Sequence, residues 1–94
     1  QRLWTNSGCA TMGYDLPASI GAHKASGKSI VCIAGDGSIM MNLQEAHTII
    51  ENNLNIKIVI FNNDGYLMIK HTQKMLFNKQ QLSTGGKPGL EFGV

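Results

Sequence analysis

The chain has a low content of charged residues and only two cysteines, and both features narrow the functions that it can have. Eight Lys and Arg residues against six Asp and Glu in 94 residues leave a net charge of +2 without a basic run, so composition gives no support to nucleic-acid binding. No apolar stretch reaches the roughly 18 residues of a membrane-spanning helix, and no signal-peptide pattern is visible at the start. We therefore expect a cytoplasmic protein without a membrane partner. Cys9 and Cys32 stand in no metal-binding spacing and are not expected to form a disulfide.

Two apolar segments each run directly into a polar cluster. Residues 29–34 lead into Gly35-Asp36-Gly37-Ser38, and residues 56–61 lead into Asn62-Asn63-Asp64-Gly65. Runs of β-branched residues bounded by Gly and Asn predict buried parallel strands. Both clusters then lie at the carboxyl ends of strands, where open α/β sheets bind ligands.

The other expected elements surround these two strands in an α/β arrangement, a parallel sheet with flanking helices. Asn42, with Glu45 three residues on, has the pattern of a helix N-cap. Asp15 is expected to cap an earlier helix, which Gly27 terminates. The expected elements are a helix over 15–26, a loop over 35–41, a helix over 42–53, a turn at 54–55, a helix over 66–77, and a divergent, disordered tail over 78–94.

The side chains of the two clusters suit a hard metal ion and a phosphate. Asp36 offers a carboxylate, Asn63 an amide carbonyl and Gly65 a main-chain carbonyl. A ligand set made only of oxygen favours Mg²⁺ or Ca²⁺ over zinc. Gly37 lets a phosphate approach the backbone closely, and Ser38 adds a hydroxyl donor. The clusters together predict a site for a metal-bridged diphosphate.

Each cluster by itself also has a purely structural explanation. An Asp between two glycines forms Asx turns, and Asn-Asn-Asp-Gly is a common turn sequence. Met12 alone is typical of a core residue. His23, His47 and His71 share no ligand spacing and are expected at the surface. Only the pairing of Asp36 with Asn63 favours the metal site over a pair of turns.

The two clusters, at this spacing, strongly resemble the diphosphate-binding motif of thiamine-diphosphate enzymes. The resemblance is closest to the acetolactate synthase-like branch, which is related to the pyruvate and benzoylformate decarboxylases, and it covers roughly residues 4–77. It implies thiamine diphosphate and Mg²⁺ as cofactors. By this resemblance Asp36 and Asn63 are side-chain Mg²⁺ ligands and Gly65 gives its carbonyl. Gly37 and Ser38 would then hold the diphosphate, and Gly35 is a cofactor-binding residue of the same motif.

The segment from Ser7 to Ala22 resembles the stretch that precedes the motif in the same branch. A bulky apolar residue at the place of Met12 props the cofactor into its bent conformation in that family. The backbone around Ala10 would hydrogen-bond the aminopyrimidine ring. Many relatives carry Gly where this chain has Ala10, and a main-chain carbonyl serves either way.

The resemblance implies a part of an enzyme that acts on 2-oxo acids by decarboxylation and carboligation. Enzymes of this branch are several times longer, so we expect the 94 residues to be one partial diphosphate-binding domain. The Glu that activates the pyrimidine ring belongs to another domain in that family. The expected partners are therefore the 2-oxo acid substrate and a pyrimidine-binding domain of the same or another chain, in a homo-oligomeric parent.

Three alternatives remain open at this point. One is a part of a simple 2-oxo acid decarboxylase, and another is a non-catalytic or degenerate fragment of such an enzyme. The third is a different nucleotide or phosphate binder on a doubly wound sheet. The chain has neither the G-x-G-x-x-G nor the G-x-x-x-x-G-K-[ST] pattern, which gives the third alternative little support.

Overall fold

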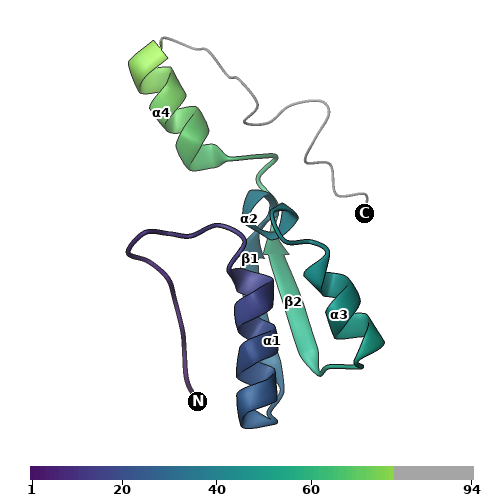
Figure 1. Ribbon diagram of the computed structural model, residues 1–94. Coiled ribbons are helices and arrows are strands. Elements are labelled where there is room, and N and C mark those ends of the chain that lie inside the picture. The colour runs from purple at the N-terminus through teal and green to yellow at the C-terminus, as the bar shows by residue number, and fades with distance from the viewer. Residues whose placement is uncertain (78–94) are drawn as a thin grey trace.

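The structure, a computed structural model, describes residues 1–77. Within them, helices precede, separate and follow two strands (Figure 1). The elements in chain order are α1 (Asp15–Ser26), β1 (Ile30–Gly35), α2 (Asp36–Met40), α3 (Glu45–Glu51), β2 (Ile56–Phe61) and α4 (Leu67–Phe77). The expected tail over 78–94 lies outside the described residues. None of the helices among residues 1–77 has both the length and the apolar character needed to cross a membrane.

The two strands pair in parallel, which confirms the expected fold class. Ile30 lies opposite Ile56, and Gly35 lies opposite Phe61 at the other end. The second strand has the predicted bounds, and the first begins and ends one residue later than predicted. Because the strands are parallel and in register, the two segments that follow them leave the sheet at the same edge.

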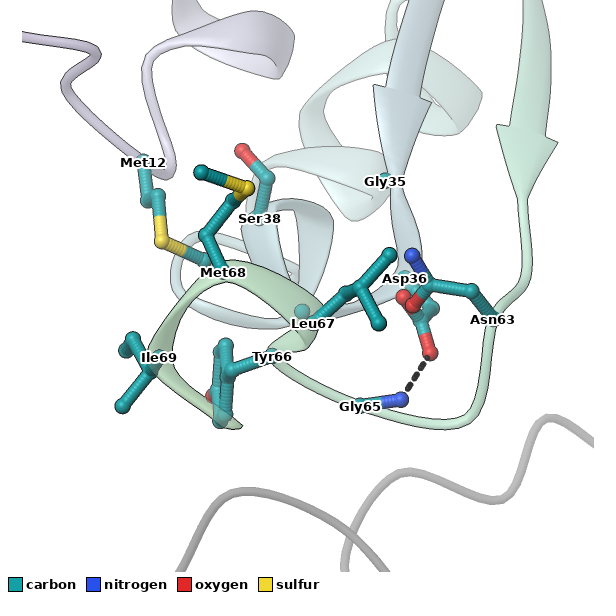
Figure 2. Close-up of a pocket in the computed structure, with 11 residues that line it drawn as sticks. Met12, Gly35, Asp36, Ser38, Asn63, Gly65, Tyr66, Leu67, Met68 and Ile69 are labelled. Atoms are coloured by element: carbon teal, nitrogen blue, oxygen red, sulfur yellow. Dashed lines mark hydrogen bonds between the residues drawn. The ribbon is translucent and has the colours of Figure 1, made fainter. Parts of the chain in front are cut away.

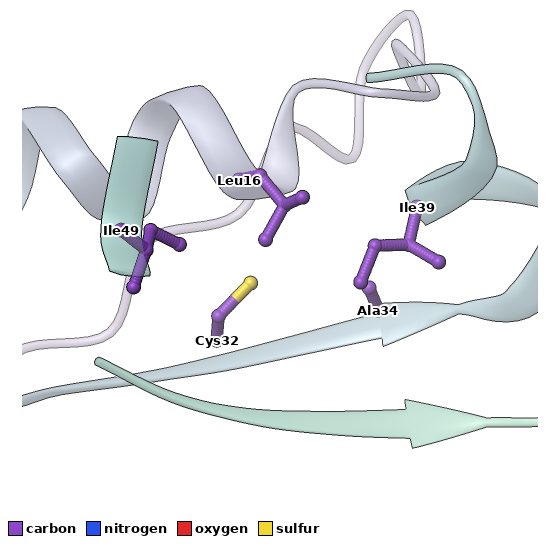
Figure 3. Packing of buried hydrophobic residues seen from close by; sticks show 5 residues of the cluster. All are labelled: Leu16, Cys32, Ala34, Ile39 and Ile49. Atoms are coloured by element: carbon purple, nitrogen blue, oxygen red, sulfur yellow. The ribbon is translucent and has the colours of Figure 1, made fainter. Parts of the chain in front are cut away.

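The hydrophobic core lies on one face of the sheet. Cys32 and Ala34 of β1 point toward this face, and they meet side chains from three helices (Figure 3). The core consists of Leu16 from α1, Cys32, Ala34, Ile39 from α2 and Ile49 from α3. Cys32 is thus a buried free cysteine that packs as a small core residue.

The opposite face of the sheet is open, and here the prediction of buried strands is wrong. Val31 and Ile33 of β1 are 60% and 59% exposed, and Phe61 of β2 is 66% exposed. Continuous β-branched runs are typical of strands that are covered on both faces. Within residues 1–77 the three helices that pack on the sheet contribute their buried side chains to the same core, so they cover one face only.

Helix α1 has the predicted bounds, but Asp15 does not cap it. The N-cap residue is Tyr14, and no side chain bonds there. Asp15 lies in the first turn, where its Oδ1 accepts the N–H of Leu16 at 2.9 Å. Gly27 ends the helix as predicted, since it has φ +66° and its N–H donates to the carbonyl of His23.

The stretch between the strands differs most from the prediction. The loop expected over 35–41 contains the short helix α2, and the helix expected over 42–53 is reduced to α3. Asn42 does not cap α3; its Nδ2 donates to the carbonyl of Gly13 at 2.6 Å, and its Oδ1 accepts from Gln44 at 2.9 Å. The capping pattern fails because a partner that is distant in sequence takes the amide.

Helix α4 begins at Leu67, one residue after the predicted start, and runs to Phe77. In Figure 1 it extends away from the sheet on the side of the strands' carboxyl ends. Most of its apolar side chains are exposed, among them Met68 at 78% and Met75 at 76%. Its first turn therefore borders that edge of the sheet, while the rest of the helix makes few contacts with the core.

Candidate functional site at the carboxyl edge of the sheet

Asp36 joins the two polar clusters. It is the first residue of α2, directly after β1, and only 1% of it is exposed. Its Oδ2 accepts the N–H of Gly65 at 2.8 Å, and Gly65 lies in the loop that follows β2 (Figure 2). Gly65 is buried and has φ +129°, a backbone conformation that favours glycine. The clusters that the sequence places at two strand ends thus form one site.

The side-chain amide of Asn63 completes this site. One of its terminal atoms lies 3.1 Å from Asp36 Oδ1 and 2.6 Å from the carbonyl oxygen of Gly65. If that atom is the amide nitrogen, it donates to both oxygens. If the amide is turned over, its oxygen forms a cluster with the other two, and no donor lies between them.

With the Asn63 oxygen turned toward Asp36 and Gly65, the three oxygens fit a small hard cation. Magnesium binds oxygen at about 2.0–2.1 Å in an octahedron, which places neighbouring ligand oxygens about 2.9 Å apart. The two separations at Asn63, 2.6 and 3.1 Å, bracket that spacing. Within residues 1–77 no group of three or more His, Cys, Asp or Glu residues could hold a metal ion, so the described part of the chain offers no zinc-type site.

A pocket of about 230 Å³ opens beside the oxygen cluster (Figure 2). Its lining includes all the cofactor-binding residues expected from the sequence except Ala10: Met12, Gly35, Asp36, Gly37, Ser38, Asn63 and Gly65. The remaining lining residues are Tyr66, Leu67, Met68 and Ile69. In Figure 2 the Asp36, Asn63 and Gly65 end of the pocket lies on one side, and Met12, Met68 and Ile69 lie on the other.

Ala10 lies outside the pocket. It is exposed, has φ +48°, and its N–H donates to the carbonyl of Asn6 at 3.0 Å. The turn that contains it is also held by Asn6 Nδ2, which donates to the carbonyl of Thr11 at 2.8 Å. The structure thus brings Met12 to the pocket and leaves Ala10 in the turn before it.

Tyr66 is one of four lining residues that are not among the site residues expected from the sequence. Its ring lies against Gly37 so closely that a Cβ on Gly37 would stand 2.5 Å from two ring carbons. The methyl group of Met12 would be 3.5 Å from the same Cβ, so the Tyr66 ring and the Met12 methyl both lie against Gly37. Gly37 is therefore required by the approach of a side chain, in addition to any role toward a phosphate. The only sequence signal was an aromatic residue directly after the Gly65 turn.

The hydroxyl of Ser38 is engaged within the chain. It donates to Asp15 Oδ2, and it accepts the N–H of Gly13 at 3.1 Å. The sequence assigns this hydroxyl to a diphosphate, whereas in the structure its proton is directed toward α1. Ser38 consequently connects the first turns of α1 and α2 next to the pocket.

The two cysteines and His47 are not among the residues that line the pocket. Cys9 is exposed and Cys32 is buried, and neither is in a disulfide. Burial, together with the nearby charge of Asp15, raises the pKa of the Cys32 thiol, and a hydrogen bond with Ser19 partly opposes that rise. His47 pairs with Glu51 at 3.1 Å on the surface of α3, as expected for a histidine without a site role.

A parallel α/β sheet with a pocket and an oxygen cluster at its carboxyl edge is the arrangement of a cofactor-binding domain. Comparison with known proteins gives the family. Residues 1–92 match the family model described as "Thiamine pyrophosphate enzyme, C-terminal TPP binding domain". The chain therefore belongs to the thiamine pyrophosphate enzyme family, in its C-terminal cofactor-binding domain, which confirms the resemblance found in the sequence.

Curated relatives are named as acetolactate synthases. The chain is 44% identical over 90 residues to the acetolactate synthase isozyme 1 large subunit of Escherichia coli (strain K12), covering 94% of this chain and 16% of that protein. It is 46% identical over 82 residues to the acetolactate synthase large subunit of Cyanidium caldarium, covering 85% of this chain and 14% of that protein. A probable acetolactate synthase large subunit of Methanococcus aeolicus is 41% identical over 87 residues, covering 89% of this chain and 14% of that protein.

Membership of this family implies thiamine diphosphate, also called thiamine pyrophosphate, with Mg²⁺ as the cofactor. The chain spans less than a fifth of the length of these relatives. Their names, as large subunits, indicate a multi-domain or oligomeric enzyme. What is common to this chain and its relatives is therefore one cofactor-binding region.

Proposed function

We propose that the chain is the Mg²⁺-binding and diphosphate-binding part of an acetolactate synthase-like enzyme that acts on 2-oxo acids. The convergence of the Asp36 carboxylate, the Asn63 side-chain amide and the Gly65 carbonyl beside the pocket is the observation that carries this proposal. The names of the relatives favour acetolactate synthesis over simple decarboxylation.

Asp36, Asn63 and Gly65 would hold the metal ion. A single carboxylate with two neutral oxygens leaves half of the formal charge of Mg²⁺ uncompensated, which suits an ion shared with a diphosphate. The amide orientation with nitrogen toward the two oxygens stabilises the site without an ion, and the opposite orientation offers a third oxygen to an ion. Asn63 thereby serves both forms of the site without any change of backbone.

The residues at the start of α2 would contact the diphosphate. Gly35 ends β1, and the N–H groups of Gly37 and Ser38 lie in the first turn of α2, where a helix offers no acceptor to its own donors. Because the ring of Tyr66 covers Gly37, contact of a phosphate at that point requires the ring to turn away.

Met12 and Ala10 would serve the ring portion of the cofactor. Met12 lines the pocket at the end away from the oxygen cluster, as a prop for the bent cofactor requires. Ala10, two residues earlier, would offer its main-chain carbonyl to the aminopyrimidine ring once the turn over 7–10 adjusts to the cofactor. Thiamine diphosphate supplies a carbanion and an electron sink for the decarboxylation of 2-oxo acids.

In this family the catalytic Glu belongs to a separate pyrimidine-binding domain. We infer that a pyrimidine-binding domain, from the same or another chain of a homo-oligomer, completes the active site above this pocket. The residues of this chain then bind and orient the cofactor, and the apolar wall of the pocket keeps water from its reactive end.

Calorimetric titration of the 94-residue chain with thiamine diphosphate tests the proposal. We expect binding that requires Mg²⁺ and that is lost in Asn63→Ala. The matched control is Asn55→Ala, which removes an exposed amide at the opposite end of β2, where Ser29 donates to it at 3.3 Å. Binding that persists without Mg²⁺, or that survives in Asn63→Ala, would contradict the proposed metal site.

A product assay distinguishes acetolactate synthesis from simple decarboxylation and from a non-catalytic fragment. Adding a purified pyrimidine-binding domain of an acetolactate synthase large subunit, with pyruvate, would produce acetolactate if the proposal holds. Release of an aldehyde alone would identify a part of a simple decarboxylase. Binding of cofactor without any turnover in that mixture would identify a non-catalytic fragment.

A further inference from the structure

The backbone of Gly13 is held on both sides. Its N–H, in the peptide group shared with Met12, donates to Ser38 Oγ at 3.1 Å, and its carbonyl, in the peptide group shared with Tyr14, accepts from Asn42 Nδ2 at 2.6 Å. The two partners come from different elements, α2 and the turn after it, and both lie far from Gly13 in sequence. The two peptide groups that flank the Gly13 Cα are therefore each fixed by one hydrogen bond.

Asp15 fixes the direction in which the Ser38 hydroxyl points. Its Oδ2 takes the hydroxyl proton, and its Oδ1 accepts the N–H of Leu16 in the first turn of α1. A hydroxyl has one proton, so this bond leaves only lone pairs of Ser38 Oγ for the N–H of Gly13. The acidic side chain thereby selects the acceptor role of Ser38.

There is no free space around Gly13. It is buried with φ +84°, and a Cβ on it would meet Met41 Cβ at 2.9 Å and Asn42 Nδ2 at 3.1 Å. Met12, its neighbour in the chain, lines the pocket. The position of the Gly13 peptide therefore sets where the Met12 side chain begins.

We propose that Asp15, Ser38 and Asn42 form a clamp on Gly13 that holds Met12 at the wall of the pocket. In this clamp the three side chains act as positioning residues, and Asp15 and Asn42 touch no ligand. The consequence for ligands rests on the proposed function, since Met12 would face the ring portion of the cofactor. The clamp itself exists in the free chain and is tested there.

Nuclear magnetic resonance of the full 94-residue chain tests the clamp without any ligand. Two observables are followed: the hydrogen-exchange rate of the Gly13 amide and the resonance of the ¹³C-labelled Met12 methyl group, which, like the Tyr66 ring, lies close to Gly37. In Asn42→Ala and in Asp15→Ala we expect faster exchange at Gly13, by about three- to tenfold for the loss of one net hydrogen bond. We also expect the Met12 methyl resonance to move toward its position in an unfolded chain.

Matched controls separate the clamp from general loosening of the chain. Asn52→Ala removes an amide that donates to the carbonyl of Thr48 at 2.9 Å within α3, away from the pocket. Glu45→Ala removes a first-turn carboxylate that accepts from the Thr48 hydroxyl at 3.2 Å. Neither control should alter Gly13 or Met12, and the amide of Cys32 in the core reports whether each variant is folded.

A pair of ligands then tests the positional role in the presence of Mg²⁺. On the proposed function, thiamine diphosphate would reach Met12, whereas inorganic pyrophosphate would occupy only the end of the pocket at Asp36. We expect Asn42→Ala to weaken thiamine diphosphate by about three- to tenfold, on the same scale of one hydrogen bond, and to leave inorganic pyrophosphate unchanged. A structural defect alone would weaken both ligands together.

The outcomes are distinguishable. Unchanged Gly13 exchange and an unchanged Met12 resonance in both folded variants would overturn the clamp. If an Asp15 variant fails to fold, Asn42→Ala decides by the same two observables. If the unaltered chain binds neither ligand, the proposed function fails, while the observables of the free chain still support or overturn the clamp. Equal loss of both ligands would overturn the role of the clamp toward the ring portion.

Discussion

Replacing Asp36 by Asn separates the metal-binding role of this residue from its structural role. The side chain keeps its shape, so the N–H of Gly65 still finds an acceptor at 2.8 Å. A hydrogen bond to a charged group contributes about 1.5–3 kcal/mol and one to a neutral group about 0.5–1.5, so the exchange costs roughly 1 kcal/mol. The desolvation of a carboxylate that is 1% exposed is removed at the same time, which offsets part of that cost.

The two chains should therefore unfold with free energies within about 1 kcal/mol of each other when no metal is present. With Mg²⁺ and thiamine diphosphate at about 100 times the dissociation constant, the unaltered chain gains about 2.7 kcal/mol. Asp36→Asn should gain almost nothing, because its site lacks the charged ligand. Urea unfolding followed by far-ultraviolet circular dichroism, with and without ligand, measures both differences.

Asp64→Asn is the control for this experiment. It makes the same change of charge in the same loop, its side chain is exposed and outside the pocket, and its φ of +59° is one that Asn adopts readily. Asp64→Asn should gain as much from Mg²⁺ and cofactor as the unaltered chain. Equal stabilisation of Asp36→Asn by the ligands would refute the assignment of Asp36 as a metal ligand.

Three further predictions can be checked with the same unfolding assay. Gly37→Ala should cost about 1–3 kcal/mol, since its Cβ would stand 2.5 Å from the Tyr66 ring, and adding Tyr66→Ala should recover most of the loss. Leu16→Ala should cost about 2–5 kcal/mol because Leu16 is fully buried, whereas Ile50→Ala, at 75% exposure, should change stability by less than about 0.5 kcal/mol. The raised pKa of Cys32 means that the folded state keeps a proton that the unfolded state loses above about pH 8.5. Stability should be full below that pH and fall as the pH rises toward the folded-state value, and Cys32→Ala should lack this fall.

Each of these expectations can fail independently. Additive losses in the Gly37 and Tyr66 double variant would show that the ring does not cause the strain. Equal costs for Leu16→Ala and Ile50→Ala would contradict the one-sided core. An identical alkaline decline in Cys32→Ala would assign it to other groups.

The parts of the site that sequence predicts are those that depend on strand ends. Once two apolar runs are parallel strands, the polar residues after each must meet at one edge, so Asp36 and Gly65 are found in contact. Bounds of α1 and β2 follow from the same local signals, including Gly27 in the left-handed conformation.

The parts that sequence misses depend on partners distant in the chain. Asn42 has the local pattern of a cap, yet its amide bonds Gly13, and no nearby residue signals this. The contact between Tyr66 and Gly37 is likewise a matter of packing across two loops. Burial of the strands was misjudged because a run of β-branched residues indicates two covered faces but carries no information on what covers them.

The open face of the sheet has a consequence for how the chain behaves at high concentration. Within residues 1–77, Val31, Ile33, Val59 and Phe61 present adjacent apolar side chains to water, and the outer edges of the two strands carry backbone groups that no other described strand pairs. We expect such a surface to adhere to copies of itself, so that the association state of the chain changes with protein concentration. Light scattering over a dilution series should therefore accompany each ligand-binding measurement on the chain. Self-association would lower the concentration of monomeric chain that is available to bind ligand.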